Sequence, residues 1–311
     1  MRGNVLCLLR AALILASLAS GTASAAPTAA PNHQAAPTPE VTIPQPPGPA
    51  GSVRPRDSYP NGGALLEQSL YSRALSQDIS YWIFLPPGYD ASARRYPVVY
   101  MLHGLDADSE QWPAFGLTGT ADELIADGDI QPLLIVLPFG WNSYFLNDPR
   151  DGLRWADHIT TEVVGDVDRR YRTVARARSR AIGGLSMGGD AALRFALTFP
   201  ELFGVSGAHS PSTRFSYDEA PEGLFADEEA FNRANPLWLI THTRVARKLK
   251  VWLDVGEDDP WLLNVRAIHE LLEEQGVEHE LHIYEGEHGD EYWSDHVADY
   301  LRFYSAALES R

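Results

Sequence analysis

The chain has 311 residues, of which 44% are hydrophobic and 22% charged, a composition typical of a globular protein. Its formal net charge of −17 disfavours binding to nucleic acid or to an anionic membrane surface, because both depend on clustered Lys and Arg. The single cysteine, Cys7, excludes an intramolecular disulfide and a cysteine metal cluster.

The first 25 residues have the pattern of a secretory signal peptide. Arg2 provides a positive start, residues 5–18 are mostly apolar, and residues 23–25 (Ala-Ser-Ala) fit a small-residue cleavage site. A membrane anchor is disfavoured, because the apolar run is shorter than the about 20 residues of a membrane span and Arg10 interrupts it. We therefore expect a secreted or periplasmic protein, with no stable membrane insertion of the mature chain.

Residues 26–61 are predicted to form a disordered linker. Ten of the 22 prolines lie in residues 27–60, with alanine, threonine and glycine between them. This composition favours extended polyproline II and cannot bury a core. The segment is interpreted either as a stalk that separates the body from a surface or as a leader without a role. Residues 62–311 are expected to form one folded domain.

From residue 62 onward, short apolar runs alternate with helical stretches. The runs that indicate strands cover residues 79–85, 97–102, 133–137, 180–185, 250–255 and 279–284. The helical stretches cover residues 118–126, 158–171, 187–199, 265–275 and 291–308. Continuous apolar strands that alternate with helices predict an α/β fold, with a mostly parallel central sheet flanked by helices. Such a sheet has its ligand site beyond the carboxyl ends of its strands.

A short cap-like insertion is expected at residues 211–239, between two strands. The segment is acidic, and an acidic rim over a site would disfavour anionic substrates. A solvated surface is the simpler interpretation of the same charges.

Ser186 is the candidate nucleophile. It lies in Gly184-Leu185-Ser186-Met187-Gly188, a Gly-x-Ser-x-Gly match that is weak by itself. Here the match follows a short apolar strand and precedes a helix of small and apolar residues, which is the setting of a nucleophile elbow. The flanking glycines remove side chains that would block the sharp turn.

The order Ser, acid, His along the chain supplies the rest of a triad. Three acids in and after the strand 250–255 are candidates for the residue that orients the histidine. Asp254 lies within the strand, and Asp259, at the far end of the loop, is preferred to Asp258. His288 is the preferred base, because it follows the next strand after the loop that carries Asp259. His209, the main rival, precedes that loop in the chain.

In this interpretation His288 accepts the proton of Ser186 while the serine oxygen attacks an ester carbonyl. Asp259 holds the imidazole in the required tautomer. The tetrahedral oxyanion needs backbone N–H donors, and we expect these from Met187, directly after the nucleophile, and from Leu105, after the third strand.

These motifs resemble the esterase D-like putative esterase family of the α/β-hydrolases, which includes feruloyl and acetyl-xylan esterases, S-formylglutathione hydrolases and mycolyltransferases. The resemblance covers most of residues 62–308 and rests on residues 85–89, 96–104, 183–189 and 286–288. It implies an α/β-hydrolase fold in which the family acid matches Asp259, the family histidine matches His288 and the oxyanion donors match Leu105 and Met187. The mycolyltransferase branch fits less well, because its members usually lack a His-Gly pair such as residues 103–104.

Aromatic residues in the loops are candidate substrate contacts. We predict substrate binding by Trp112, Trp141, Trp261 and Trp293, with ordinary packing as an equal alternative. The expected substrate is a small-molecule or carbohydrate-linked ester, and no metal and no cofactor is expected.

Three classes of function remain open at this point. The first is a secreted serine carboxylic-ester hydrolase. The second is an acyltransferase of the mycolyltransferase type, in which an alcohol replaces water. The third is a non-enzymatic cell-wall binding protein on a hydrolase fold, which has no need for Ser186, Asp259 and His288 together.

Overall fold

A computed structural model describes residues 53–148, 151–243 and 249–310. The predicted signal peptide and most of the predicted linker lie outside the described residues. Within these ranges, no helix has both the length and the apolar character needed to cross a membrane.

The described residues contain one nine-stranded sheet with the strand order β1-β2-β3-β5-β4-β6-β7-β8-β9. The neighbouring strands from β5 through β4, β6, β7 and β8 to β9 pair in parallel. The pairs β1–β2, β2–β3 and β3–β5 are antiparallel. The strands are β1 Val53–Ser58, β2 Ala64–Ser72, β3 Gln77–Leu85, β4 Val98–Leu102, β5 Leu134–Pro138, β6 Arg180–Leu185, β7 Val205–His209, β8 Lys250–Gly256 and β9 Glu278–Tyr284.

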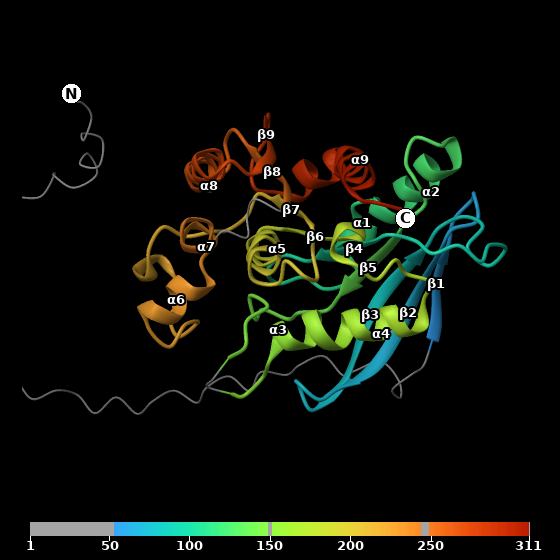
Figure 1. Cartoon of the computed structure of the whole chain (residues 1–311), viewed down its shortest axis with the longest axis horizontal. Helices are drawn as coiled ribbons and strands as arrows, with labels where there is room; N and C mark the ends of the chain where they lie inside the picture. Colours follow the sequence, from blue (N-terminus) through green and yellow to red (C-terminus); the bar gives the residue numbers. More distant parts are fainter. Residues whose placement is uncertain (1–52, 149–150, 244–248, 311) are drawn as a thin grey trace, which may run out of the picture. The chain divides into compact units, whose positions relative to one another are not determined.

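Helices cover both faces of this sheet (Figure 1). They are α1 Gln111–Ala114, α2 Leu117–Asp127, α3 Trp155–Asp157, α4 Val164–Arg170, α5 Met187–Thr198, α6 Glu228–Ala234, α7 Pro236–His242, α8 Leu262–Gln275 and α9 Asp290–Ala307. A π-helix, His158–Val163, joins α3 to α4, and the 3₁₀ turns are Ala177–Ser179 and Tyr217–Glu219. The predicted α/β architecture with a mostly parallel sheet is confirmed.

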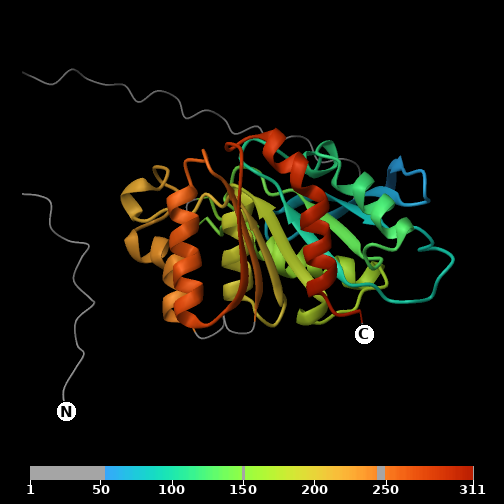
Figure 2. The ribbon, with the colours of Figure 1, turned by 90° about the horizontal axis from the view of Figure 1, so that it is seen from above.

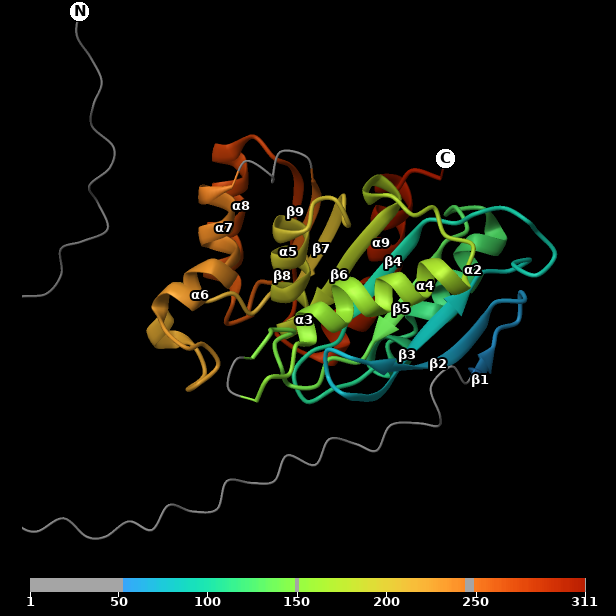
Figure 3. The same cartoon turned by 60° about the horizontal axis from the view of Figure 1, so that its bottom comes forward.

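The two faces of the sheet carry separate hydrophobic cores, because successive side chains of a strand point to opposite faces. In β4, Val98 and Tyr100 belong to the core that includes residues of α4, α5, α7 and α8. Val99 and Met101 belong to the core that includes residues of α2 and α9. Figure 2 shows α9, in red, running along the sheet, and Figure 3 shows α4 crossing the opposite side. Burial on both faces explains why the strands are continuous apolar runs.

The predicted domain boundary at residue 62 is wrong, because the fold begins earlier. Strand β1 pairs with β2, and the Arg56 guanidinium lies 4.0 Å from the centroid of the Trp82 ring and bonds Glu110 at 2.6 Å. Pro55 is compatible with this strand because β1 is at the edge of the sheet, where an N–H group is not required on the outer side. The boundary was placed too late because the proline-rich composition extends into β1, the first strand of the domain.

The predicted insertion at residues 211–239 contains a 3₁₀ turn, α6 and the first part of α7. Helix α6 begins at an Asp227 side chain that accepts a hydrogen bond from the Ala230 N–H, and α7 begins at Asn235 in the same way. Helix α7 packs against α5 and α8, so the insertion is anchored beside the helix that follows the nucleophile.

Candidate active site

Ser186 lies on a strained turn between β6 and α5. Its backbone has φ 52° and ψ −114°, a conformation that a residue with a side chain rarely adopts. The turn requires glycine on both sides: a Cβ on Gly184 would lie 2.5 Å from the Gly188 backbone, and one on Gly188 would lie 2.5 Å from the Leu102 carbonyl oxygen. The motif is therefore explained by backbone crowding.

Neighbouring segments hold this turn in place. The Ser186 N–H donates to the carbonyl oxygen of His209 at the end of β7, at 2.9 Å. The Ser186 carbonyl oxygen accepts from the N–H of Asp190 at 3.0 Å and from the N–H of Ser212 at 3.1 Å. The strain is thus compensated by hydrogen bonds from β7, from α5 and from the loop that follows β7.

The structure brings Ser186, His288 and Asp259 together. The distance from Ser186 Oγ to His288 Nε2 is 2.9 Å, and that from His288 Nδ1 to Asp259 Oδ2 is 2.8 Å. In the tautomer with its proton on Nδ1, His288 donates to Asp259 and accepts from the Ser186 hydroxyl. The His288 side chain is 23% exposed while that of Asp259 is fully buried, so solvent reaches the base but not the acid.

Only one of the three candidate acids contacts His288. Asp259 also accepts a hydrogen bond from the Trp261 N–H through Oδ1, at 2.7 Å, which orients the carboxylate. Asp258 is exposed, although its N–H donates to the Gly286 carbonyl oxygen and so ties the acid loop to the histidine loop. Asp254 is buried in a different network.

His209, the rival histidine, is a buried partner of Asp254. Its Nδ1 lies 2.6 Å from Asp254 Oδ1, and its Nε2 lies 3.0 Å from the hydroxyl oxygen of Tyr304. Tyr292 and Tyr300 each donate to Asp254 Oδ2 at 2.9 Å. Burial beside this carboxylate raises the pKa of both tyrosines. The network anchors α9 to the ends of β7 and β8 and does not contact Ser186 Oγ.

The two predicted oxyanion donors lie at the start of α5 and in the loop after β4. Met187 is the first residue of α5, where backbone N–H groups have no acceptor inside the helix. In the loop after β4, the N–H groups of Gly104 and Asp106 donate to Gln111 and Asn142, both at 2.7 Å. Between them, the Leu105 N–H has no acceptor among the described residues.

The loop that carries Leu105 is braced by His103. Its Nδ1–H donates to the Gly104 carbonyl oxygen at 2.7 Å, and its Nε2 accepts from the Gly140 N–H at 2.9 Å. Burial lowers the pKa of His103 to about 4, so the ring is neutral at pH 7 and both hydrogen bonds are retained. His103 is therefore a structural residue and not a second base. Gln111 and Asn142 orient the same loop, and neither belongs to a motif that sequence reasoning could have recognised.

The four tryptophans predicted to bind substrate fall into two groups. Trp112 and Trp293 are buried, with 1% and 4% of their surface exposed. Trp112 donates to the Leu102 carbonyl oxygen, and Trp293 packs edge-on against His288 with ring centroids 4.9 Å apart. Core packing covers these two side chains, which argues against the prediction that they contact substrate. Trp141 and Trp261 are partly exposed and stay predictions.

The crowding at the elbow makes a testable prediction for Gly188. We expect Gly188→Ala to lower the free energy of unfolding by about 1–3 kcal/mol, as overpacking does, and to lower kcat more than tenfold. The new Cβ would push against the Leu102 and His103 carbonyl oxygens and displace the Leu105 loop. Urea denaturation and ester kinetics measure the two effects.

Gly165→Ala in α4, where a Cβ has open space, is the matched control and should change neither the free energy of unfolding nor kcat by much. Wild-type kinetics in Gly188→Ala would contradict the crowding argument.

Comparison with known proteins gives a family and a set of relatives. The sequence model of the family described as "Putative esterase" matches residues 72–304. The chain is 31% identical over 165 residues to an endo-1,4-beta-xylanase/feruloyl esterase of Xylanibacter ruminicola, covering 49% of this chain and 22% of that protein. It is 25% identical over 239 residues to an esterase of Mycobacterium tuberculosis, covering 66% and 51%. The chain therefore spans about a fifth to a half of these curated relatives.

Solved structures extend the likeness to the whole domain. A ferulic acid esterase aligns with a TM-score of 0.71 at 23% identity, over 79% of this chain and 99% of its own. An S-formylglutathione hydrolase from Agrobacterium tumefaciens aligns with a TM-score of 0.69 at 21% identity, over 82% and 99%. At these identities the likeness shows the fold, which is that of the α/β-hydrolases.

Proposed function

The chain belongs to the putative esterase family, and from this membership we propose that it is a serine hydrolase of carboxylic esters. The observation that carries the proposal is the unbroken chain of hydrogen bonds from Ser186 through His288 to Asp259. A serine on a strained turn, a partly exposed histidine and a buried carboxylate are the groups that an acyl-enzyme mechanism needs.

In the first half-reaction, the Ser186 oxygen attacks the ester carbonyl carbon and its proton passes to His288 Nε2. The imidazolium that forms is stabilised by the Asp259 carboxylate. The N–H groups of Leu105 and Met187 stabilise the negative charge that develops on the carbonyl oxygen. The C–O bond to the alcohol then breaks, and the alcohol oxygen takes the proton from His288.

In the second half-reaction, a water molecule attacks the acyl-enzyme and gives its proton to His288. The tetrahedral intermediate releases the carboxylic acid, and Ser186 Oγ regains its proton from His288 Nε2. Side chains and backbone N–H groups perform every step. The names of the relatives support a carboxylic ester, either small or linked to a carbohydrate, as the substrate. Export through residues 1–25 stays part of the proposal.

Partition of a shared acyl-enzyme tests this mechanism. Acetates with different phenol leaving groups, hydrolysed in water with added methanol, should give one constant ratio of methyl acetate to acetic acid. The reason is that both products arise from the same acetyl-Ser186 after the phenol has left. Product analysis by gas chromatography measures the ratio, with Ser186→Ala as the blank. A ratio that varies with the leaving group would contradict an acyl-enzyme, and near-complete transfer at low methanol would identify an acyltransferase.

A further inference from the structure

Arg214 is a cation beside the proposed triad that has no carboxylate partner among the described residues. Its Nη1 donates to the Ser212 carbonyl oxygen at 3.2 Å, and its Nη2 donates to the Tyr144 hydroxyl at 3.1 Å. The guanidinium carbon lies 5.2 Å from the centroid of the Tyr144 ring and 5.3 Å from that of Trp261. Two of the five N–H donors of a guanidinium are thus used within the protein.

Two residues that contact Arg214 also bond residues of the proposed triad. Trp261, one wall of the guanidinium site, donates its backbone N–H to Asp259, the acid that contacts His288. Ser212, which accepts from Arg214, donates its own N–H to the carbonyl oxygen of Ser186. A single residue therefore links Arg214 to Ser186 and another single residue links it to Asp259.

Asp190, an acid that lines the same hollow as Arg214, already has hydrogen-bond partners. Asp190 Oδ2 accepts from Arg194 at 3.2 Å, and Asp190 Oδ1 accepts from the Thr213 hydroxyl at 2.7 Å. Arg194 also donates to the Tyr144 carbonyl oxygen, at 2.6 Å. The positive charges of Arg194 and Arg214 both act on this one carboxylate, but only Arg194 forms a salt bridge with it.

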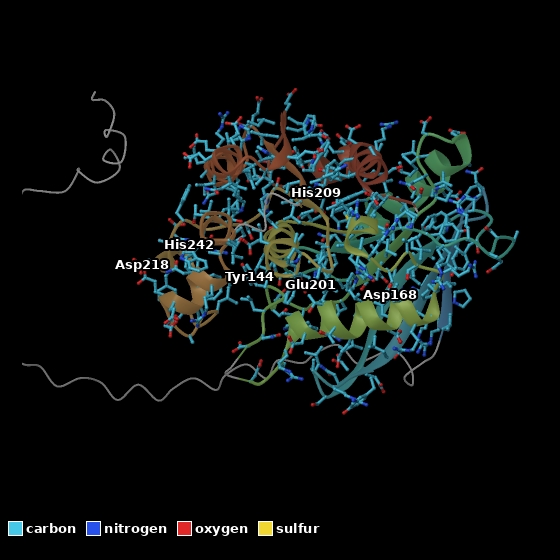
Figure 4. The ribbon with its side chains drawn as sticks, viewed as in Figure 1. Tyr144, Asp168, Glu201, His209, Asp218 and His242 are labelled. Carbon is cyan, nitrogen blue, oxygen red and sulfur yellow. The ribbon has the colours of Figure 1, made fainter. Side chains whose placement is uncertain are left out.

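A hollow adjoins Arg214 on the side of the insertion. It is lined by Arg214, by the Asp190–Arg194 ion pair, and by Tyr144 with the apolar side chains Leu224, Phe225 and Phe231. In Figure 4, Tyr144 lies between α5 and α6, in agreement with this lining. The hollow has a volume of only about 20 Å³, enough for a water molecule, so a carboxylate would reach the partly exposed Arg214 from the solvent side.

We propose that Arg214 binds a free carboxylate of the substrate, so that the preferred esters carry one carboxylate besides the scissile ester. This inference rests on the proposed serine-esterase function and names the class of substrate for that site. It also reverses the expectation from the acidic insertion, because the charge that a bound substrate meets is that of Arg214 and not the net charge of the surface. Rings on two sides reduce the solvent screening of the pair.

Matched esters that differ only in the carboxylate test the proposal. On the acyl side, the pair is mono-p-nitrophenyl adipate and p-nitrophenyl hexanoate. On the alcohol side, the pair is 4-acetoxybenzoate and 4-methylphenyl acetate. The wild-type enzyme should prefer the charged member in at least one pair. Arg214→Gln should reduce that preference about tenfold or more, mainly through KM, because a charge-assisted hydrogen bond is lost.

Three further measurements separate recognition from a structural role of Arg214. Activity of Arg214→Gln on the neutral esters should stay within about threefold of wild type, and Arg214→Lys should restore part of the preference. The preference should shrink as salt is added. Arg233→Gln, an exposed arginine of α6 that pairs with Glu229, is the matched control and should keep the wild-type preference.

Two results would overturn the inference: no preference for the charged ester in either pair, or an equal loss on charged and neutral esters in Arg214→Gln. The second result would mean that Arg214 only braces Ser212 and Tyr144. Failure of the proposed function is a different result, namely turnover of the neutral esters that survives in Ser186→Ala.

Discussion

Ser186→Ala should abolish ester hydrolysis, with kcat lowered by roughly 10⁶, because the members of a triad act as a unit. The substitution removes the attacking oxygen and leaves His288 and Asp259 in place. Stability should change little or increase slightly, since the strained turn is held by backbone hydrogen bonds that alanine retains. Steady-state kinetics and thermal denaturation of the two proteins measure these effects.

Covalent labelling identifies the nucleophile independently of turnover. A fluorophosphonate should modify the wild-type protein at Ser186 and nowhere else, as read by peptide mass spectrometry. Ser206→Ala is the matched control, because Ser206 is fully buried in β7 and its hydroxyl has no partner among the described residues. Labelling of a second serine, or substantial activity of Ser186→Ala, would refute the assignment of the nucleophile.

Asp259→Asn should lower kcat by about 10⁴. An amide in this position no longer stabilises the imidazolium, and it favours the tautomer of His288 that cannot accept the serine proton. The backbone of the loop should be unchanged, because the Trp261 N–H still finds an oxygen acceptor at residue 259. The expected loss is therefore one of catalysis and not of folding.

Asp258→Asn is the matched control for this experiment. Asp258 is adjacent in the chain and exposed, and only its backbone N–H links the acid loop to Gly286. Its substitution should change kcat by less than about threefold, since a surface charge contributes little. A larger loss in Asp258→Asn than in Asp259→Asn would assign the orienting acid to Asp258.

The parallel part of the sheet was predictable because a strand that is buried on both faces has a continuous apolar sequence. The apolar runs at residues 97–102, 133–137 and 180–185 correspond to β4, β5 and β6 within one or two residues. Strands β1 and β2 were missed for the converse reason. β1 is exposed along its whole length, and β2 mixes polar with apolar residues, so neither forms a continuous apolar run.

The tryptophans show where loop composition fails as a guide to a binding site. Trp112 and Trp141 both follow a strand, and in sequence they are equivalent candidates. In the structure, α1 turns Trp112 into the core beneath the Leu102 carbonyl, whereas Trp141 stays in a loop with a partly exposed side chain. Arg214 is the opposite case, since its significance depends on the Tyr144 and Trp261 rings, which are 70 and 47 residues away in the chain.

The sequence by itself determined the parallel core, the sharp turn at Ser186 and the chain order of the residues proposed as the triad, because strand burial and turn geometry are local and restrict the residue types that fit. The tertiary structure alone decided which acid contacts His288, which tryptophans are buried and which charges remain unpaired. Those outcomes depend on distances between loops that are brought to one edge of the sheet by strands far apart in the chain. The sequence separated Asp254 from Asp259 only by their places within and after a strand, and the side chains packed around each one distinguish a structural anchor from the proposed catalytic acid.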